Sequence, residues 1–135
     1  MKLEVEMKSP ILAPNETQVR NAIARLKSFG PNSFASLSDV HGNYLQVAGG
    51  GITCMLERRD AATGRHFRGF KLEKNSNYPD GTRLVFGAGE IALQSDEWFN
   101  HTEIAEVFTA FLGGNELPPF INWRDVSDIL SSRSR

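Results

Sequence analysis

Residues 34–47 read FASLSDVHGNYLQV, and this stretch holds two short strand-like segments on either side of a loop. The first segment is 34–38 and the second is 44–47. Between them, residues 39–43 include Asp, His, Gly and Asn, residue types that accept the backbone conformations of tight turns. The stretch therefore predicts a β-hairpin with a loop of about five residues.

Strand-like segments continue on both sides of this hairpin. A second hairpin is predicted from residues 52–59 and 66–72, which flank an Asp-Ala-Ala-Thr-Gly turn. Residues 82–86 follow a Pro-Asp-Gly loop and predict a further strand, and 91–94 predict a short one. Residues 2–8 alternate apolar and charged side chains, which indicates a first strand with one face on a core and one in water.

Two helices are predicted outside the strand-rich region. Asn15 is followed three residues later by Gln18, and Asn100 by Glu103, and both pairs match the capping box that begins a helix. The first helix should end near Phe29, before a Gly-Pro pair, and the second before a Gly-Gly pair. Apolar side chains recur at helical spacing in both segments, and we expect this core set: Val19, Ile23, Leu26, Ile104, Val107, Phe108 and Phe111.

These patterns predict a single α+β domain over residues 1–135, with a mainly antiparallel sheet and the two amphipathic helices packed against it. Residues 120–123 follow two prolines and should form an extended or irregular tail that packs on the domain. We expect the last residues, 131–135, to be frayed. The composition agrees with one globular domain, because 40% of the residues are hydrophobic and 23% are charged.

The net charge is -1, from 15 Lys and Arg residues against 16 Asp and Glu residues. A chain so close to neutral has no global attraction for nucleic acid or for an anionic membrane, and we expect neither as a partner. No window approaches the ~18 apolar residues of a membrane span, and the first eight residues are charged where a signal peptide is apolar. We therefore expect a cytoplasmic protein. Cys54 is the single cysteine, which fits a reducing compartment and a buried thiol.

The motifs that resemble catalytic or ligand sites fail on context. Gly49–Gly51 lacks the Gly-Lys-Ser/Thr of a phosphate loop, and favours a bulge or a sharp strand connection where backbones approach closely. The GAGEIA match to a dinucleotide motif at 87–92 carries a glutamate that would repel pyrophosphate. His41, His66 and His101 lack the spacing of metal ligands. We expect no catalytic residue, no cofactor and no metal.

The distribution of charge is the most informative feature of the sequence. Residues 1–89 hold 12 basic and 8 acidic groups, a net charge of +4, whereas residues 90–135 hold 3 basic and 8 acidic groups, a net charge of -5. No Lys or Arg occurs between residues 90 and 116. One interpretation is that Asp96, Glu97 and Glu103 lie near a helix N-terminus, where the helix dipole favours carboxylates. The alternative, which we expect here, is an acidic face for a basic protein partner with a tryptophan as its apolar anchor, formed by these residues: Glu90, Asp96, Glu97, Trp98, Glu103 and Glu106.

Five segments of the chain follow one another in a familiar order: YLQVAGG at 44–50, LERR at 56–59, HFR at 66–68, a helical segment with Gly-Gly at 103–114, and WRDV at 123–126. In this order the chain resembles the small immunity proteins of bacterial polymorphic-toxin and contact-dependent inhibition systems, and in layout the first-numbered family of that group. The resemblance implies a noncatalytic α+β protein that binds one cognate toxin domain in the producing cell and blocks it.

An acidic partner would steer quickly to the basic substrate groove of a nucleic-acid-targeting toxin, which is the toxin class we expect. Two functions of other classes stay open. One is a small enzyme or metabolite-binding domain with a site near Gly49–Gly51 and His41 or His66. The other is an adaptor or chaperone with an exposed apolar groove. If a toxin does not bind the acids, the basic strands around Arg58, Arg59 and Arg68 are the alternative surface.

Overall fold

The computed structural model describes residues 1–128, so the expectation of a frayed end at 131–135 lies outside the described residues. The chain folds into two helices and nine strands within this range. In chain order the elements are β1 (Lys2–Val5), β2 (Ile11–Leu12), α1 (Glu16–Ala24), β3 (Phe34–Ser38), β4 (Tyr44–Gly50), β5 (Thr53–Asp60), β6 (Arg65–Phe70), β7 (Thr82–Phe86), β8 (Gly89–Leu93), α2 (His101–Leu112) and β9 (Asn122–Asp125).

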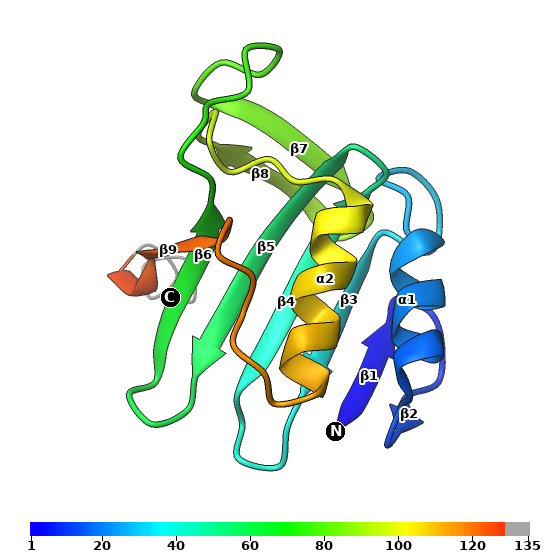
Figure 1. Cartoon of the computed structure of the whole chain (residues 1–135). Coiled ribbons are helices and arrows are strands. Elements are labelled where there is room, and N and C mark those ends of the chain that lie inside the picture. The colour runs from blue at the N-terminus through cyan, green and yellow to red at the C-terminus, as the bar shows by residue number, and fades with distance from the viewer. Residues whose placement is uncertain (129–135) are drawn as a thin grey trace.

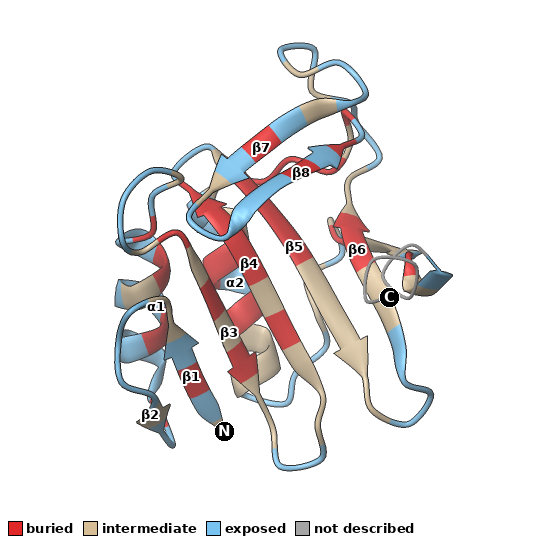
Figure 2. Cartoon of the chain, turned by 180° about the vertical axis from the view of Figure 1, so that it is seen from behind, coloured by how far each residue is buried: buried red, intermediate tan, exposed pale blue. Residues whose placement is uncertain are grey.

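Seven of the strands form one antiparallel sheet in the order β2-β1-β3-β4-β5-β6-β9. The other two, β7 and β8, form a separate antiparallel hairpin. The helices α1 and α2 lie side by side on one face of the large sheet (Figure 1). The β7–β8 hairpin lies on the opposite face, over one end of β4 and β5 (Figure 2). The predicted α+β fold with two helices packed on a mainly antiparallel sheet is confirmed.

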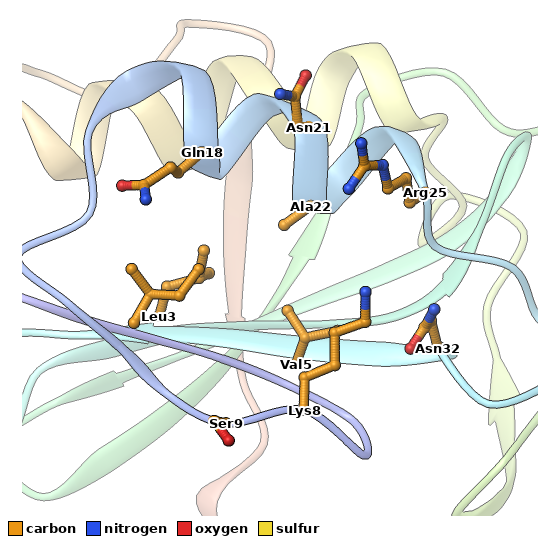
Figure 3. Close-up of a pocket in the computed structure, with 10 residues that line it drawn as sticks. Leu3, Val5, Lys8, Ser9, Gln18, Asn21, Ala22, Arg25 and Asn32 are labelled. Carbon is orange, nitrogen blue, oxygen red and sulfur yellow. The ribbon is translucent and has the colours of Figure 1, made fainter.

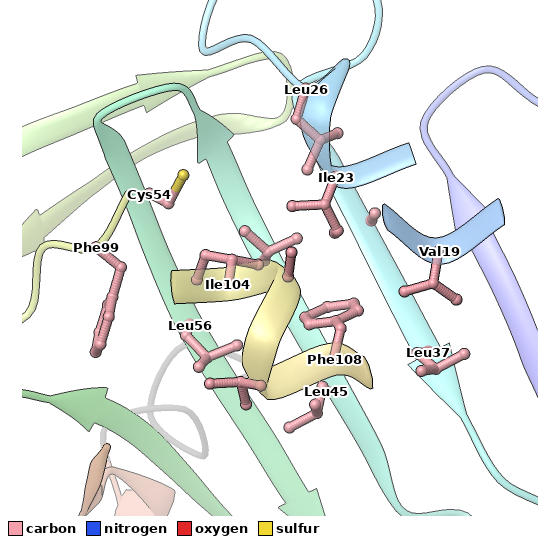
Figure 4. Packing of buried hydrophobic residues seen from close by; sticks show 14 of the residues in the cluster. Val19, Ile23, Leu26, Leu37, Leu45, Cys54, Leu56, Phe99, Ile104 and Phe108 are labelled. Atoms are coloured by element: carbon pink, nitrogen blue, oxygen red, sulfur yellow. The ribbon is translucent and has the colours of Figure 1, made fainter. Parts of the chain in front are cut away.

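Two hydrophobic cores lie on the two faces of the sheet. The larger one fills the space between the sheet and the helices, where Val19, Ile23 and Phe108 are at most 1% exposed (Figure 4). Six of the seven expected core residues are buried, and Phe111 packs against them half-buried. The smaller core lies under the β7–β8 hairpin and contains these residues: Ala48, Met55, Leu84, Ile91, Leu93 and Trp98.

Both predicted capping boxes are present. The Asn15 and Asn100 side chains each accept a hydrogen bond from the backbone N–H three residues later, and the side-chain oxygens of Gln18 and Glu103 accept one from the backbone N–H of the cap residue. Helix α1 ends at Ala24, earlier than predicted, because the chain turns there and the N–H of residue 27 donates to the carbonyl of residue 32.

The glycines at the β4–β5 turn permit the close approach that the sequence indicates. A Cβ on Gly50 would overlap the carbonyl oxygen of Leu26, and one on Gly49 would overlap that of Thr53. Gly49 also has a φ of 87°, a left-handed conformation that favours glycine. The turn therefore holds the end of the first helical segment against the sheet.

The strands near the two ends of the chain differ most from the prediction. The first strand ends at Val5 because Met7 turns the chain with a φ of 63°, and the short strand β2 follows, which the sequence did not indicate. The tail at 120–123, predicted to be extended or irregular, is extended from Asn122 onward and continues to Asp125 as strand β9, which pairs with β6. This pairing supplies backbone hydrogen bonds from a segment more than fifty residues away, so local pattern gave no sign of it.

Candidate functional site: the open face of the sheet

The predicted acidic face includes two residues that are buried. Glu97 is 1% exposed and Trp98 is 3% exposed. Glu97 accepts hydrogen bonds from the backbone N–H of Gln94 at 2.7 Å and from Nη1 of Arg124 at 2.9 Å. The ring of Trp98 stacks on that of Tyr78 with 4.4 Å between centroids. The prediction that these two residues line an exposed surface is therefore wrong, since Trp98 belongs to the core under the β7–β8 hairpin and Glu97 is buried beside Arg68 and Arg124.

Asp96 and Glu103 are half-buried and paired within the chain. Asp96 lies 3.1 Å from Nη2 of Arg124, and Glu103 lies 3.1 Å from Nζ of Lys71. Glu103 also completes the capping box of α2 through the backbone N–H of Asn100. Both carboxylates thus have cations from distant segments, which the charge count within residues 90–116 did not reveal.

The remaining two acids are exposed but lie on opposite sides of the molecule. Glu90 is in β8, 3.1 Å from Nη1 of Arg83, and Glu106 is on α2. The hairpin that contains β8 and the helix α2 cover opposite faces of the large sheet (Figures 1 and 2). The six residues do not form one face, so the predicted acidic surface is wrong as a structural unit.

Two of the residues predicted for the acidic surface, Asp96 and Glu97, belong instead to a network of ion pairs. Arg68, only 4% exposed, contacts Oε2 of Glu57 at 3.0 Å through Nη2 and lies 3.7 Å from Glu97 through Nη1. Arg124 bridges Glu97 and Asp96. These five side chains, which we call the ion network, join β5, β6 and β9 to the segment before α2. Buried charges are tolerated only when they are paired in this way.

The face of the sheet turned away from the helices carries polar and aromatic side chains. The pairing register places Ser36, Gln46 and Glu57 in one row across β3, β4 and β5, and Arg68 continues that row. The next row contains Ser38, Tyr44, Arg59 and His66 in the same way. These positions alternate along each strand with core residues, so they point to the other side. We call the following set the open face: Ser36, Ser38, Tyr44, Gln46, Arg59 and His66.

All six side chains of the open face are half-buried rather than fully exposed, as Figure 2 shows for the strands seen from that side. The Tyr44 hydroxyl lies 3.4 Å from Nδ1 of His66, and Nη1 of Arg59 donates to the Gly42 carbonyl at 3.0 Å. Burial, and then the negative charge of Glu57, raise the pKa of Tyr44, so its hydroxyl stays protonated and can donate.

Three side chains of the open face have hydrogen-bond donors and acceptors that are not used within the described residues. Ser36, Ser38 and Gln46 form no side-chain hydrogen bond to any of residues 1–128. They stand next to an aromatic ring and a guanidinium, the two groups most enriched at the centres of protein interfaces. The open face is thus a surface that a protein partner can contact through hydrogen bonds, stacking and charge.

The alternative basic surface is divided by the sheet. Arg59 belongs to the open face, and Arg68 is buried and paired with carboxylates in the ion network. Arg58 points to the helix side, where its guanidinium lies 5.1 Å from the Trp123 ring and 5.6 Å from the Phe67 ring. Arg59 and Arg68 therefore lie on the same side of the sheet, and of the two only Arg59 is outside the ion network.

The structure does not assemble the alternative metabolite site. Gly49–Gly51 and His41 lie at opposite ends of the seven-residue strand β4, about 20 Å apart at the rise of a strand. His66 lies toward the His41 end, across from Tyr44. Cys54 is buried, and burial followed by the charge of Glu103 raises the pKa of its thiol to about 12, so it is not a thiolate nucleophile at neutral pH.

Within residues 1–128, no three His, Cys, Asp or Glu side chains are grouped as ligands for a metal ion. None of the helices in this range has the length and apolar character needed to cross a membrane. Comparisons of the chain with protein-family models, with curated proteins and with solved structures found no match.

Proposed function

We propose that this chain is a noncatalytic immunity protein that binds one cognate toxin domain in the cytoplasm and blocks it, and that the toxin docks on the open face. The observation that carries the proposal is the open face itself, where polar and aromatic side chains with unused hydrogen-bonding capacity lie on a rigid sheet. The order of sequence segments that resembles the immunity proteins supports the same function.

The chemistry of the open face fits a protein partner better than a small ligand. Tyr44, Arg59 and His66 supply large side chains on paired strands, so little backbone freedom is lost on binding. A surface of this kind gains affinity from a few aromatic and arginine contacts surrounded by polar groups. The partner should offer hydrogen-bonding groups to Gln46 and a carboxylate to Arg59.

The toxin's own activity is not part of this proposal. The expectation of a nucleic-acid-targeting toxin depended on one acidic surface, and the acids are instead buried, paired or separated by the sheet. The proposed partner is therefore a toxin domain of any chemistry whose surface complements the open face.

The function can be tested by co-expressing this chain with the C-terminal domain of the protein that the neighbouring gene encodes. We expect this chain to rescue growth when the domain is toxic alone and to form a one-to-one complex with it. Tyr44→Ala should speed dissociation about 30-fold, which corresponds to about 2 kcal/mol for an anchor at the centre of an interface. Gln46→Arg should abolish rescue by placing a bulky cation in the middle of the face.

Glu106→Lys is the matched control, since this exposed residue lies on the helix side. It should leave association and dissociation unchanged. If Glu106→Lys weakens the complex and the two open-face variants do not, the toxin docks on the helices and the assignment of the surface is wrong. If no complex forms and growth is not rescued, the immunity function itself is rejected.

A further inference from the structure

A pocket lies between the β1–β2 hairpin and helix α1, on the helix side of the sheet and away from the open face (Figure 3). Its volume is about 190 Å³. Leu3, Val5 and Ala22 form part of its apolar lining, and Lys8, Arg25 and Asn32 stand at its polar end. We call this feature the α1 pocket.

Both charged residues that line the α1 pocket are cations. Neither the Lys8 ammonium nor the Arg25 guanidinium forms an ion pair or hydrogen bond with another of the described residues. In Figure 3 the Lys8 side chain rises from the hairpin toward the helix and the Arg25 guanidinium lies beside the helix, and both residues line the pocket. No carboxylate lines the pocket to neutralise them.

The segment that forms one wall of the α1 pocket lies between two residues with an uncommon backbone conformation. Met7 has a φ of 63° and Ala13 a φ of 49°, and these are the positive-φ residues other than glycine within residues 1–128. They bracket the segment that carries Lys8 and Ile11 over the pocket. Met7 is 84% exposed, so burial of its side chain does not compensate for the strain. Strained backbone of this kind concentrates where a segment is held in position around a ligand.

We propose that the α1 pocket binds a small monocarboxylate with an apolar body about the size of a benzene ring. An engineered apolar cavity of about 150 Å³ accepts benzene, so 190 Å³ leaves room for one carboxylate besides. The apolar body would lie on Leu3, Val5 and Ala22. The carboxylate would accept charge-assisted hydrogen bonds from Arg25 and Lys8, the strongest class of hydrogen bond available to it.

This inference does not depend on the proposed immunity function, because the α1 pocket and the open face lie on opposite sides of the sheet. A ligand in the pocket would contact the β1–β2 hairpin with its loop, helix α1 with its C-cap Arg25, and the loop at Asn32. The pocket can therefore be tested on the isolated full chain, without a toxin.

Titration of the ¹⁵N-labelled chain with sodium benzoate and with sodium 4-methylpentanoate, followed by amide chemical shifts, tests the pocket. We expect saturable shifts at Val5, Asn21 and Ala22 with a dissociation constant of about 1 mM, as befits a ligand of this size. Benzamide, which has the same body without the charge, should bind at least about fivefold more weakly. Arg25→Gln should weaken benzoate binding by about tenfold.

Two further variants make the test specific. Ala22→Leu fills the pocket and should abolish the shifts in a chain whose spectrum is otherwise folded. Lys27→Gln removes a nearby exposed cation that does not line the pocket, and should leave binding unchanged.

The proposal is overturned if neither acid produces saturable shifts at about 20 mM, well above the expected dissociation constant. It is also overturned if benzamide binds as well as benzoate, or if Ala22→Leu retains binding. Equal weakening by Lys27→Gln and Arg25→Gln would show nonspecific attraction to surface cations and would likewise exclude the site.

Discussion

Replacing Glu97 by Gln removes one negative charge from the ion network while keeping the size of the side chain. The Glu97 side chain is 2% exposed and has three donors around it. These are the backbone N–H of Gln94 at 2.7 Å, Nη1 of Arg124 at 2.9 Å and Nη1 of Arg68 at 3.7 Å. A buried group with three donors is a structural anion, whereas a toxin-binding group on the surface would have water in their place.

The size of the effect follows from what the substitution leaves behind. Breaking a buried ion pair from one side costs about 3–5 kcal/mol, because the other charge stays buried without compensation. In the Glu97→Gln variant, Arg124 still has its ion pair with Asp96 and Arg68 still has its ion pair with Glu57. Each of the two cations therefore loses only one of its two carboxylate partners. We therefore expect Glu97→Gln to lower the free energy of unfolding by about 3 kcal/mol, the lower end of that range.

Urea unfolding followed by tryptophan fluorescence measures this loss. With a slope of about 2 kcal/mol per molar urea, the midpoint should fall by about 1.5 M at unchanged slope. The melting temperature should fall by about 10 °C. Glu106→Gln is the control, because its exposed side chain has no ion pair within the described residues, and it should change stability by less than about 0.5 kcal/mol.

A double-mutant cycle with Arg124→Met separates loss of the contact from general damage. If Glu97 and Arg124 interact, the free energy of unfolding lost in the double variant should be smaller than the sum of the two single losses, by at least about 1 kcal/mol. Strictly additive losses, or a Glu97→Gln protein as stable as the Glu106→Gln control, would refute the buried network and return Glu97 to the surface.

Three further substitutions test the fold at single positions. Phe108→Ala should cost about 3–5 kcal/mol in urea unfolding because Phe108 is fully buried, and a loss under about 1 kcal/mol contradicts its place in the core. Gly50→Ala should destabilise by about 3 kcal/mol or prevent folding, since the added methyl meets the Leu26 carbonyl, and thermal melts at wild-type stability would disprove that contact. The Arg65 guanidinium holds the pKa of Asp125 below its ordinary value of 3.8. Because the folded pKa is lowered, the stability that Asp125 adds is present above pH 3.8 and is lost as the pH falls through the folded value, so the stability difference from Asp125→Asn should vanish in acid. A difference that is the same at neutral and acid pH would exclude this ion pair as its source.

The elements that the sequence predicts well are those whose determinants are local. Asn15 with Gln18 and Asn100 with Glu103 mark the helix starts correctly because a capping box needs only residues three apart. The hairpin at 34–47 is also correct, since its loop chemistry and its strands are contiguous. Strand β9 was missed because its pattern is short and its stability comes from pairing with β6.

The candidate site was predicted poorly for the same physical reason. A window of sequence shows how many charges it holds, but it does not show which distant segment brings their counterions. Glu103 has its cation 32 residues away in Lys71, and Asp96 has its cation 28 residues away in Arg124. The open face was equally hidden, because Gln46 and Arg59 become neighbours only when β4 and β5 pair.

The charge asymmetry between residues 1–89 and 90–135 takes a different meaning once these pairs are known. Lys71 with Glu103, Arg68 with Glu97, and Arg83 with Glu90 all join the basic part of the chain to the acidic part. The surplus of acids in the second part therefore complements the first part of the same chain. Exposed pairs of this kind add little stability, whereas the buried pair Arg68–Glu97 is costly to break from one side because the other charge stays buried.

We therefore expect a partner to be recognised by polar groups that have no partner within the fold, and not by the acidic residues that are numerous in one segment of the sequence. On the open face these are the hydroxyls of Ser36 and Ser38 and the amide of Gln46, and in the α1 pocket they are the charges of Lys8 and Arg25. Each unpaired group must give up water when a ligand covers it, so only a ligand that replaces those hydrogen bonds gains affinity. Under the two proposals, the open face would select a polar protein surface and the α1 pocket would select a small carboxylate.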